Sequence, residues 1–522
     1  MKFYITIVFN LFCLGVAIGQ TQQYEDFWDD EQKQPKSKGE FVNGFEYGSW
    51  TYWFPNGNVQ EEAEYYRGKL DGQVKRYYRN GKLRHNGFFS EGLQDSIQWS
   101  YYNNGQLMET GNYENGRRVG QWEYFRKNGD SLMVEVYEQG KEKLISYWNE
   151  KGVQTVVNGN GTKLEYYNNG KPSVNVTYKD GLVNGVITKW YATGEKQAEG
   201  ILRGEIEDGS WKFWYDNGQL EKEVSYDKGL LDGELKKYYR NGQLSTKGSF
   251  SQGNKVGLWE WFTIDGLPEM KGEFQTDKQH GIWKYYDEEG KLEIEGEFQN
   301  GEKTGEWTYF YKNGNRLKKG NYLSGKKTGL WQYWHPNGNK AQEGEFENDK
   351  ETGKWISWHD NNKVKAVGYF KNGELHGDWI GYYDNGVKHY EGSWQSNLKH
   401  GEWTTWYADE QLKEKGLYQE GKKSGEWTTY NQQGIITAKG QYKEDSMDGK
   451  WEFYYPNGSL LREQQYKDGD LHGKSITYHN NMAKNVVSAY KNGKLHGSYK
   501  KYDKQGTLQV EKEFNEGSPV LD

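Results

Sequence analysis

Aromatic, glycine and polar positions recur along the chain with a period of 24 residues. One repeat, residues 305–328, reads GEWTYFYKNGNRLKKGNYLSGKKT. If its first glycine is position 0, glycine anchors continue at the same step from Gly161 to Gly497, and the step extends upstream to Gly48. Only one repeat, between 143 and 161, is short. A fixed period of this kind is the signature of a repeat architecture, here of about 20 repeats.

The pattern within a repeat predicts a β-hairpin. An Asn-Gly pair at positions 8 and 9, such as Asn313-Gly314, separates two aromatic-rich runs, and this pair favours a two-residue turn with positive φ at both residues. Such a turn pairs positions that sum to 17. Position 2, which is Trp in 12 of 20 repeats, then stands opposite position 15, which is Gly in 12 of 20. We therefore expect each indole to be accommodated by a glycine.

Position 5 is aromatic in every repeat. Strict alternation along a strand places it on the face opposite to position 2, among polar neighbours. Two interpretations remain open: a bulge turns the ring into the core, which the invariance favours, or the rings form an exposed ladder that stacks on a ligand. The candidate ladder residues are Trp190, Trp214, Trp334, Trp358, Tyr382 and Trp406.

The chain organisation follows from these patterns. Residues 1–19 are predicted to be a secretory signal peptide, because one Lys precedes an apolar run that ends near Gly19. Residues 20–40 are expected to be a polar linker, in which Phe27-Trp28 either caps the first hairpin or docks a partner. Repeats then fill 41–142 and 161–515, separated by an irregular joint at 143–160 and followed by a tail at 516–522. No other stretch is apolar enough to span a membrane.

Composition and charge argue against catalysis and nucleic-acid binding. The only cysteine lies in the predicted signal peptide, and the net charge of −7 lacks the basic footprint of a phosphate-binding surface. Five histidines precede anchors, but equivalent positions two strands apart, about 9.6 Å, are too distant to share one zinc ion. These are His280, His376, His400, His472 and His496. We expect no enzyme, metal site or cofactor.

The repeat as a whole resembles the bacterial variant of the MORN repeat, as found in YwqK-type proteins that are often labelled antitoxin-like. The resemblance covers about residues 41–515 and implies an all-β, elongated meander of hairpins that binds partners. An antitoxin role fits poorly with a signal peptide. We therefore expect an exported scaffold for protein–protein interaction in the cell envelope, located in the periplasm, at the outer-membrane surface or outside the cell. The alternative is a carbohydrate- or cell-wall-binding module that uses the position-5 ladder.

Overall fold

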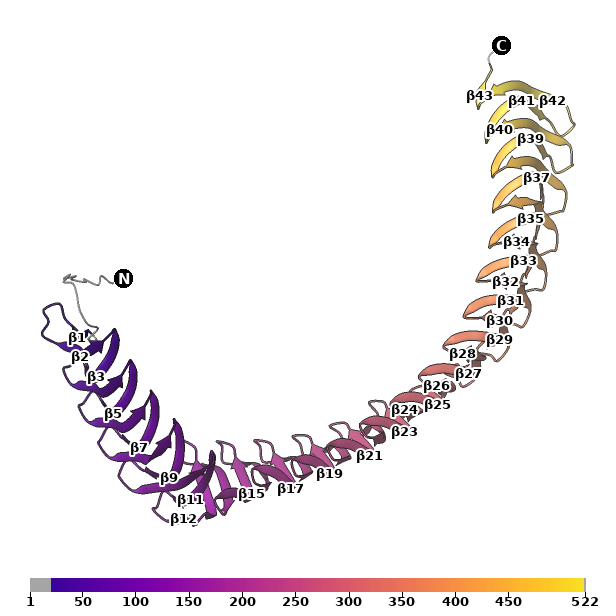
Figure 1. Cartoon of the computed structure of the whole chain (residues 1–522). Helices are drawn as coiled ribbons and strands as arrows, with labels where there is room; N and C mark the ends of the chain where they lie inside the picture. The colour runs from indigo at the N-terminus through magenta and orange to yellow at the C-terminus, as the bar shows by residue number, and fades with distance from the viewer. Residues whose placement is uncertain (1–19, 521–522) are drawn as a thin grey trace. The chain divides into compact units, whose positions relative to one another are not determined.

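The computed structural model describes residues 20–520, and its regular elements are 43 β-strands in one antiparallel sheet. Strands that are consecutive in the chain pair with one another, as β25, β26 and β27 do (Figure 1). This confirms the predicted all-β meander of hairpin repeats. Residue contacts divide the described chain into two compact parts. One runs to Gln243 and includes Phe250–Gly253, and the other comprises Leu244–Ser249 and the residues from Asn254 on.

The strands alternate between eight and nine residues in the regular repeats and are shorter at the joint and at the C-terminal end. They are β1 Thr21–Phe27, β2 Pro35–Val42, β3 Phe45–Trp53, β4 Val59–Tyr66, β5 Lys69–Tyr77, β6 Leu83–Ser90, β7 Leu93–Tyr101, β8 Leu107–Glu114, β9 Arg117–Phe125, β10 Ser131–Glu138, β11 Lys141–Trp148, β12 Gln154–Val157, β13 Asn160–Tyr166, β14 Pro172–Lys179, β15 Leu182–Trp190, β16 Lys196–Arg203, β17 Ile206–Trp214, β18 Leu220–Asp227, β19 Leu230–Tyr238, β20 Leu244–Ser251, β21 Asn254–Phe262, β22 Pro268–Gln275, β23 Lys278–Tyr286, β24 Leu292–Gln299, β25 Glu302–Phe310, β26 Arg316–Leu323, β27 Lys326–Trp334, β28 Lys340–Glu347, β29 Lys350–Trp358, β30 Val364–Lys371, β31 Glu374–Tyr382, β32 Lys388–Gln395, β33 Leu398–Trp406, β34 Leu412–Gln419, β35 Lys422–Tyr430, β36 Ile436–Lys443, β37 Ser446–Tyr454, β38 Leu460–Lys467, β39 Asp470–Tyr478, β40 Lys484–Lys491, β41 Lys494–Tyr502, β42 Leu508–Asn515 and β43 Ser518–Pro519.

The predicted register holds, but the predicted turn at Asn-Gly is wrong. Gly305 pairs with Tyr322 and Trp307 with Gly320, after which the register shifts by one residue at Phe310. The N–H of Tyr311 donates to Asn315 O (2.8 Å), the N–H of Gly314 donates to Tyr311 O (2.8 Å), and only the glycine has positive φ. The connection is therefore a three-residue loop closed by a glycine bulge, which needs one left-handed residue rather than two.

The two-residue turns with positive φ at both positions lie at the other end of the hairpin. Ser324 and Gly325, at positions 19 and 20, have φ of 48° and 78°. The same pair of positions is Asn348-Asp349 in the next repeat, with φ of 50° and 69°. Positions 19 and 20 carry glycine in fewer repeats than positions 8 and 9 do. Residue preference alone therefore assigned the two-residue turn to positions 8 and 9, which is the wrong end of the hairpin. The physical rule for type I′ turns is nevertheless obeyed.

Tryptophan at position 2 packs on a glycine of the preceding repeat. A Cβ added to Gly296 would lie 2.1 Å from the indole of Trp307, and one added to Gly320 would lie 2.2 Å from Trp331. Gly320, the hairpin partner of Trp307, thus receives the indole of the next repeat. All 12 tryptophans at position 2 have glycine 11 residues earlier, whereas the within-hairpin partner of Trp50 is Ala63. The core is therefore built between repeats.

The buried indoles join the aromatic residues at position 17 into a continuous row. Trp307 and Tyr322 have ring centroids 5.8 Å apart, Tyr322 and Trp331 5.2 Å, and Trp331 and Phe346 5.9 Å, all edge to face. Such pairs contribute about 0.5–1.5 kcal/mol each beyond the area that they bury. We call the side of the sheet that carries this row the tryptophan face.

The N-terminal stretch that we expected to be a linker forms two strands of the sheet, β1 and β2. Tyr24 of β1 packs against Phe41 and Trp50, with centroid distances of 5.3 and 5.7 Å. The indole N–H of Trp28 donates to Trp53 O at 3.0 Å. Between the alternatives for Phe27-Trp28, these contacts match a cap on the first hairpin, since they cover the exposed end of the aromatic row.

The short repeat between 143 and 161 has an irregular pairing. Strand β12 has only four residues, and the turn between β14 and β15 reaches β11, where the N–H of Leu144 donates to Gly181 O at 2.9 Å. Leu144, Tyr147 and Val156 form a separate buried cluster there. Aliphatic packing thus replaces the indole–glycine contact at this place. The predicted signal peptide, residues 1–19, lies outside the described residues.

Candidate interaction surfaces

The position-5 rings lie on the face opposite to the tryptophans, where strict alternation places them. The register does shift at position 5, but this bulge does not turn the ring into the core, so the interpretation that the invariance favoured is wrong. Tyr77 Oη donates to Glu62 at 2.7 Å, and Tyr478 Oη donates to Glu463 at 3.0 Å. In both cases the glutamate is at position 14 of the preceding repeat. The side chains of all six candidate residues are half-buried. The first part of the chain holds Trp190 and Trp214, and the second part holds Trp334, Trp358, Tyr382 and Trp406.

Cations from the preceding repeat cover four of the six candidate rings. Lys340 Nζ lies 5.5 Å from the ring centroid of Trp358, and Lys388 Nζ lies 5.1 Å from that of Trp406. Lys196 and Arg316 stand in the same relation to Trp214 and Trp334. Lys340 also pairs with Glu343 at 2.8 Å, and this bond lowers the pKa of Glu343 below its ordinary value. A lysine or arginine of the same chain therefore already covers part of each of these four rings.

Side chains at positions 6 and 8 tie many of the repeats to the next one, a feature that the sequence analysis missed. Tyr311 Oη donates to Trp334 O at 2.8 Å, and His335 Nε2 lies 3.0 Å from Trp358 O. The amide of Asn313 donates to Pro336 O at 2.8 Å. The recurrence of Tyr or His at position 6 and Asn at position 8 was the available signal. These bonds fix the backbone that carries the position-5 rings.

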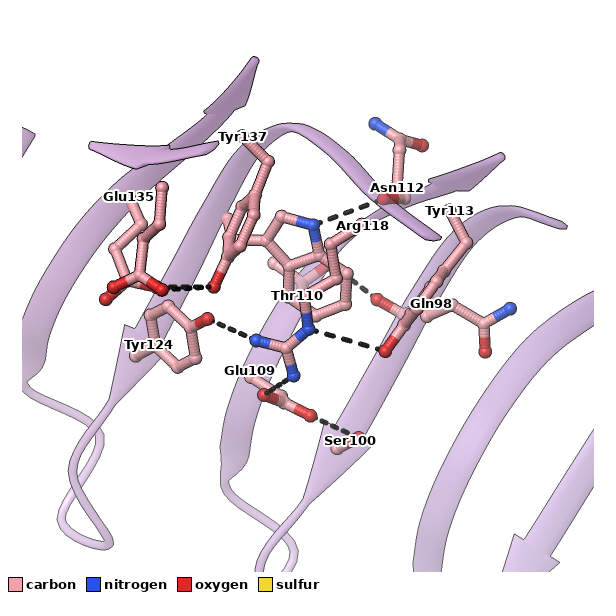
Figure 2. Close-up of polar contacts among 12 residues, drawn as sticks. Gln98, Ser100, Glu109, Thr110, Asn112, Tyr113, Arg118, Tyr124, Glu135 and Tyr137 are labelled. Carbon is pink, nitrogen blue, oxygen red and sulfur yellow. Dashed lines mark hydrogen bonds and ion pairs between the residues drawn. The ribbon is translucent and has the colours of Figure 1, made fainter. Parts of the chain in front are cut away.

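The tryptophan face carries cations at position −2. Lys303, Lys327, Lys399 and Lys423 each place Nζ within 3.8–4.8 Å of the ring centroid of the tryptophan that follows four residues later. In the first part of the chain, Arg118 takes this place, 4.0 Å from Trp122, and pairs with Glu109 at 3.1 Å (Figure 2). The tryptophan face is therefore an aromatic surface partly covered by charged side chains.

The histidines before the anchors do not converge. His280 Nδ1 is buried without a hydrogen-bond partner, and His472 Nδ1 lies 3.5 Å from the N–H of Asn492. Within residues 20–520, no group of three His, Cys, Asp or Glu side chains is arranged to hold a metal ion. The same residues contain no helix that is both long and apolar enough to cross a membrane.

These features define a class of protein: a β-repeat array in which each hairpin completes the core of its neighbour. The family model for the MORN repeat variant matches 13 segments that together cover more than half of the chain, and the chain belongs to this family. The segments are 46–65, 70–90, 97–115, 160–180, 207–228, 231–252, 279–300, 303–323, 327–348, 351–372, 375–396, 399–420 and 447–468. Membership indicates a repeat scaffold of a kind that is typically not catalytic.

Comparison with solved structures adds little. Crystal structures of TcdB2-TccC3-Cdc42 and of TcdB2-TccC3-TEV each share 12% identity with the chain, with TM-scores of 0.14 and 0.13. The alignments cover 95% and 90% of this chain but only 30% and 28% of the other, and scores this low carry no argument. No curated protein matches the sequence.

Proposed function

We propose that the protein is an exported, non-enzymatic scaffold that binds a protein partner in the cell envelope. The observation that carries this proposal is a set of exposed aliphatic side chains at position 1, opposite the tryptophan face. Leu258, Ile282 and Leu330 are 52%, 51% and 48% exposed. Exposed apolar side chains that recur in register are typical of a protein-binding surface.

Folding does not require apolar residues at position 1. The same position is Glu306 in the repeat between those of Ile282 and Leu330, and Lys354 and Asp378 in the two repeats that follow, all with the same strands and the same register. Apolar side chains there contribute nothing to the buried row of rings and favour association. We infer that position 1 varies with the partner, whereas positions 2, 15 and 17 serve the fold. Export rests on the predicted signal peptide at residues 1–19.

Co-sedimentation with isolated cell envelope, before and after protease treatment of the envelope, tests the proposal. We expect residues 20–522 to sediment with untreated envelope and to remain soluble after proteolysis. The double variant Ile282→Glu/Leu330→Glu should lose binding, because it places charge in the aliphatic row. Leu323→Glu is the matched control, since Leu323 is 66% exposed but lies outside position 1. Binding that survives proteolysis would refute a protein partner.

The position-5 ladder supports a second candidate, carbohydrate binding. Trp334, Trp358 and Trp406 are half-exposed on a face that also offers carboxylates, such as Glu343 beside Lys340, and aromatic rings beside polar groups suit sugar stacking. If envelope binding survives proteolysis, replacement of these three tryptophans with alanine should abolish it. Retained binding in that variant would exclude the ladder as a glycan site.

A further inference from the structure

Three lysines of the tryptophan face lie over aromatic rings of two adjacent repeats. Lys303 Nζ lies 4.1 Å from the ring centroid of Trp307, Lys327 Nζ lies 4.8 Å from that of Trp331, and Lys318 Nζ lies 4.3 Å from that of Tyr309. All three are half-buried, and among residues 20–520 no ion pair involves any of them. We call Lys303, Lys318 and Lys327 the lysine triad.

Lys303 and Lys318 are partly desolvated, and Lys318 has two like charges near it. Burial lowers the pKa of Lys303, and burial together with the charges of Lys327 and Lys303 lowers the pKa of Lys318. Position −2 is Lys303 and Lys327 in two successive repeats and Glu351 in the repeat after them. Within the described chain, no ion pair joins Glu351 to the triad. A bound anion would relieve this repulsion, since an opposite charge stabilises a partly desolvated cation.

The same chain shows what fits between two such lysines. Four repeats along, Lys399 and Lys423 occupy the positions of Lys303 and Lys327, and Glu414 occupies that of Lys318. Glu414 Oε2 lies 3.2 Å from Lys423 Nζ. In the first part of the chain, Glu109 and Arg118 form the corresponding pair at 3.1 Å (Figure 2). Position 13 is thus a place where a carboxylate pairs with the cation of the following repeat.

We propose that the lysine triad binds a carboxylate of an acidic segment of a partner protein. The external carboxylate takes the place that Glu414 fills within the chain four repeats away. The half-buried rings of Tyr309 and Tyr322 flank the site and contact the aliphatic part of the acidic side chain. This inference rests on the proposed scaffold function. It adds the chemistry of the partner and a second contact, on the face opposite to the position-1 side chains. The positive charges of the triad attract the acidic segment locally, against the net charge of −7 of the whole chain.

Binding of fluorescein-labelled hexaglutamate to the purified protein, followed by fluorescence anisotropy at low and physiological salt, tests the triad. We expect Lys318→Glu to weaken binding at least tenfold, because the new carboxylate pairs internally with Lys303 and Lys327. Lys312→Glu, with the same change of charge at the exposed turn of the same repeat, should change affinity by no more than twofold. Equal losses in both variants would overturn the proposal.

A gain-of-function variant keeps the test valid if Lys318→Glu disturbs folding. Glu414→Lys creates a second triad with Lys399 and Lys423, and we expect it to raise the stoichiometry from one hexaglutamate to two. An unchanged stoichiometry would contradict the proposal. Vesicles of phosphatidylcholine with phosphatidylserine, and inorganic pyrophosphate, are tested in parallel. Lys318-dependent binding of either probe without binding of hexaglutamate would replace the acidic segment with a phosphate ligand.

The two proposals fail separately. If Lys318→Glu leaves protease-sensitive envelope binding intact, the scaffold function stands and the triad is not its docking site. If hexaglutamate binding depends on Lys318 but no protein of the envelope is bound, the site stands and the proposed function is wrong.

Discussion

Replacement of Gly320 with alanine tests whether the core is built between repeats. The new Cβ would lie 2.2 Å from Cδ2 of Trp331, well inside van der Waals contact. The indole cannot simply shift away, because its Nε1 donates to Asn321 O at 3.2 Å and its ring is fully buried between Tyr322 and Phe346. We therefore expect the indole to leave its place, with loss of this bond and of its ring contacts.

The expected cost is that of overpacking a buried aromatic site. Inserting a methyl group into a packed core costs about 1–3 kcal/mol, and loss of the indole hydrogen bond adds about 1 kcal/mol. We therefore expect about 2–4 kcal/mol. Gly325→Ala is the control, because no atom lies within 4 Å of its added Cβ and only its positive φ is unfavourable. That change should cost about 1 kcal/mol.

Native-state amide exchange over residues 316–334 measures the effect locally, which suits a repeat array that need not unfold in one step. A loss of 2–4 kcal/mol corresponds to roughly 30- to 1,000-fold faster exchange, since each 1.4 kcal/mol is tenfold. Adding Trp331→Val should recover part of the loss, because Ala63 and Val74 form the same pair naturally, 3% and 0% exposed.

A double-mutant cycle decides between the two possible glycine partners of Trp331. The indole packs on Gly320 of the preceding repeat, whereas its hairpin partner is Gly344. We expect Gly320→Ala and Trp331→Val to be strongly coupled, and Gly344→Ala and Trp331→Val to be nearly additive, within about 0.5 kcal/mol. Strong coupling to Gly344 and none to Gly320 would refute the inter-repeat core.

Three further outcomes follow from the contacts described. Tyr311→Phe removes the bond to Trp334 O and should cost about 0.5–1.5 kcal/mol, seen as faster exchange in the turn of the next repeat; an unchanged rate would contradict the tie. Burial raises the pKa of Tyr333 to about 12, so its contribution to stability is complete below the unfolded pKa near 10 and is lost as pH rises toward 12. In Tyr333→Phe, the stability of this repeat should therefore fall less between pH 10 and pH 12 than in the parent protein. An identical dependence of stability on pH would count against the reasoning. The pKa of Glu343 is lowered chiefly by Lys340, so this contribution is present above the unfolded pKa near 4.3 and is lost as pH falls through the folded value; amide exchange of Glu343→Gln should differ from the parent at pH 7 and converge with it in acid.

The sequence predicted most of the hairpin correctly. The 24-residue period and the register that pairs Gly305 with Tyr322 were readable, because strand pairing is a local property. The face of the position-5 rings was left open, and the invariance of these rings favoured the wrong face. The turn at Asn313-Gly314 was predicted wrongly, since residue preference cannot distinguish a two-residue turn from a three-residue loop closed by a glycine bulge.

Contacts between repeats were decided only by the tertiary structure. A periodic sequence places every repeat in the same local environment, so it does not say whether Trp331 packs on Gly320 or Gly344. Nor does it say that Lys318 lies close enough to Lys303 and Lys327 for their charges to lower its pKa. The same limit hid the strands of residues 20–40, which lack the repeat signature and pair only because the first hairpin offers a free edge. The sequence by itself thus determined the repeated hairpin and its register. The packing of one hairpin on the next determined the core and the charged surface, because those contacts join residues that no local pattern relates.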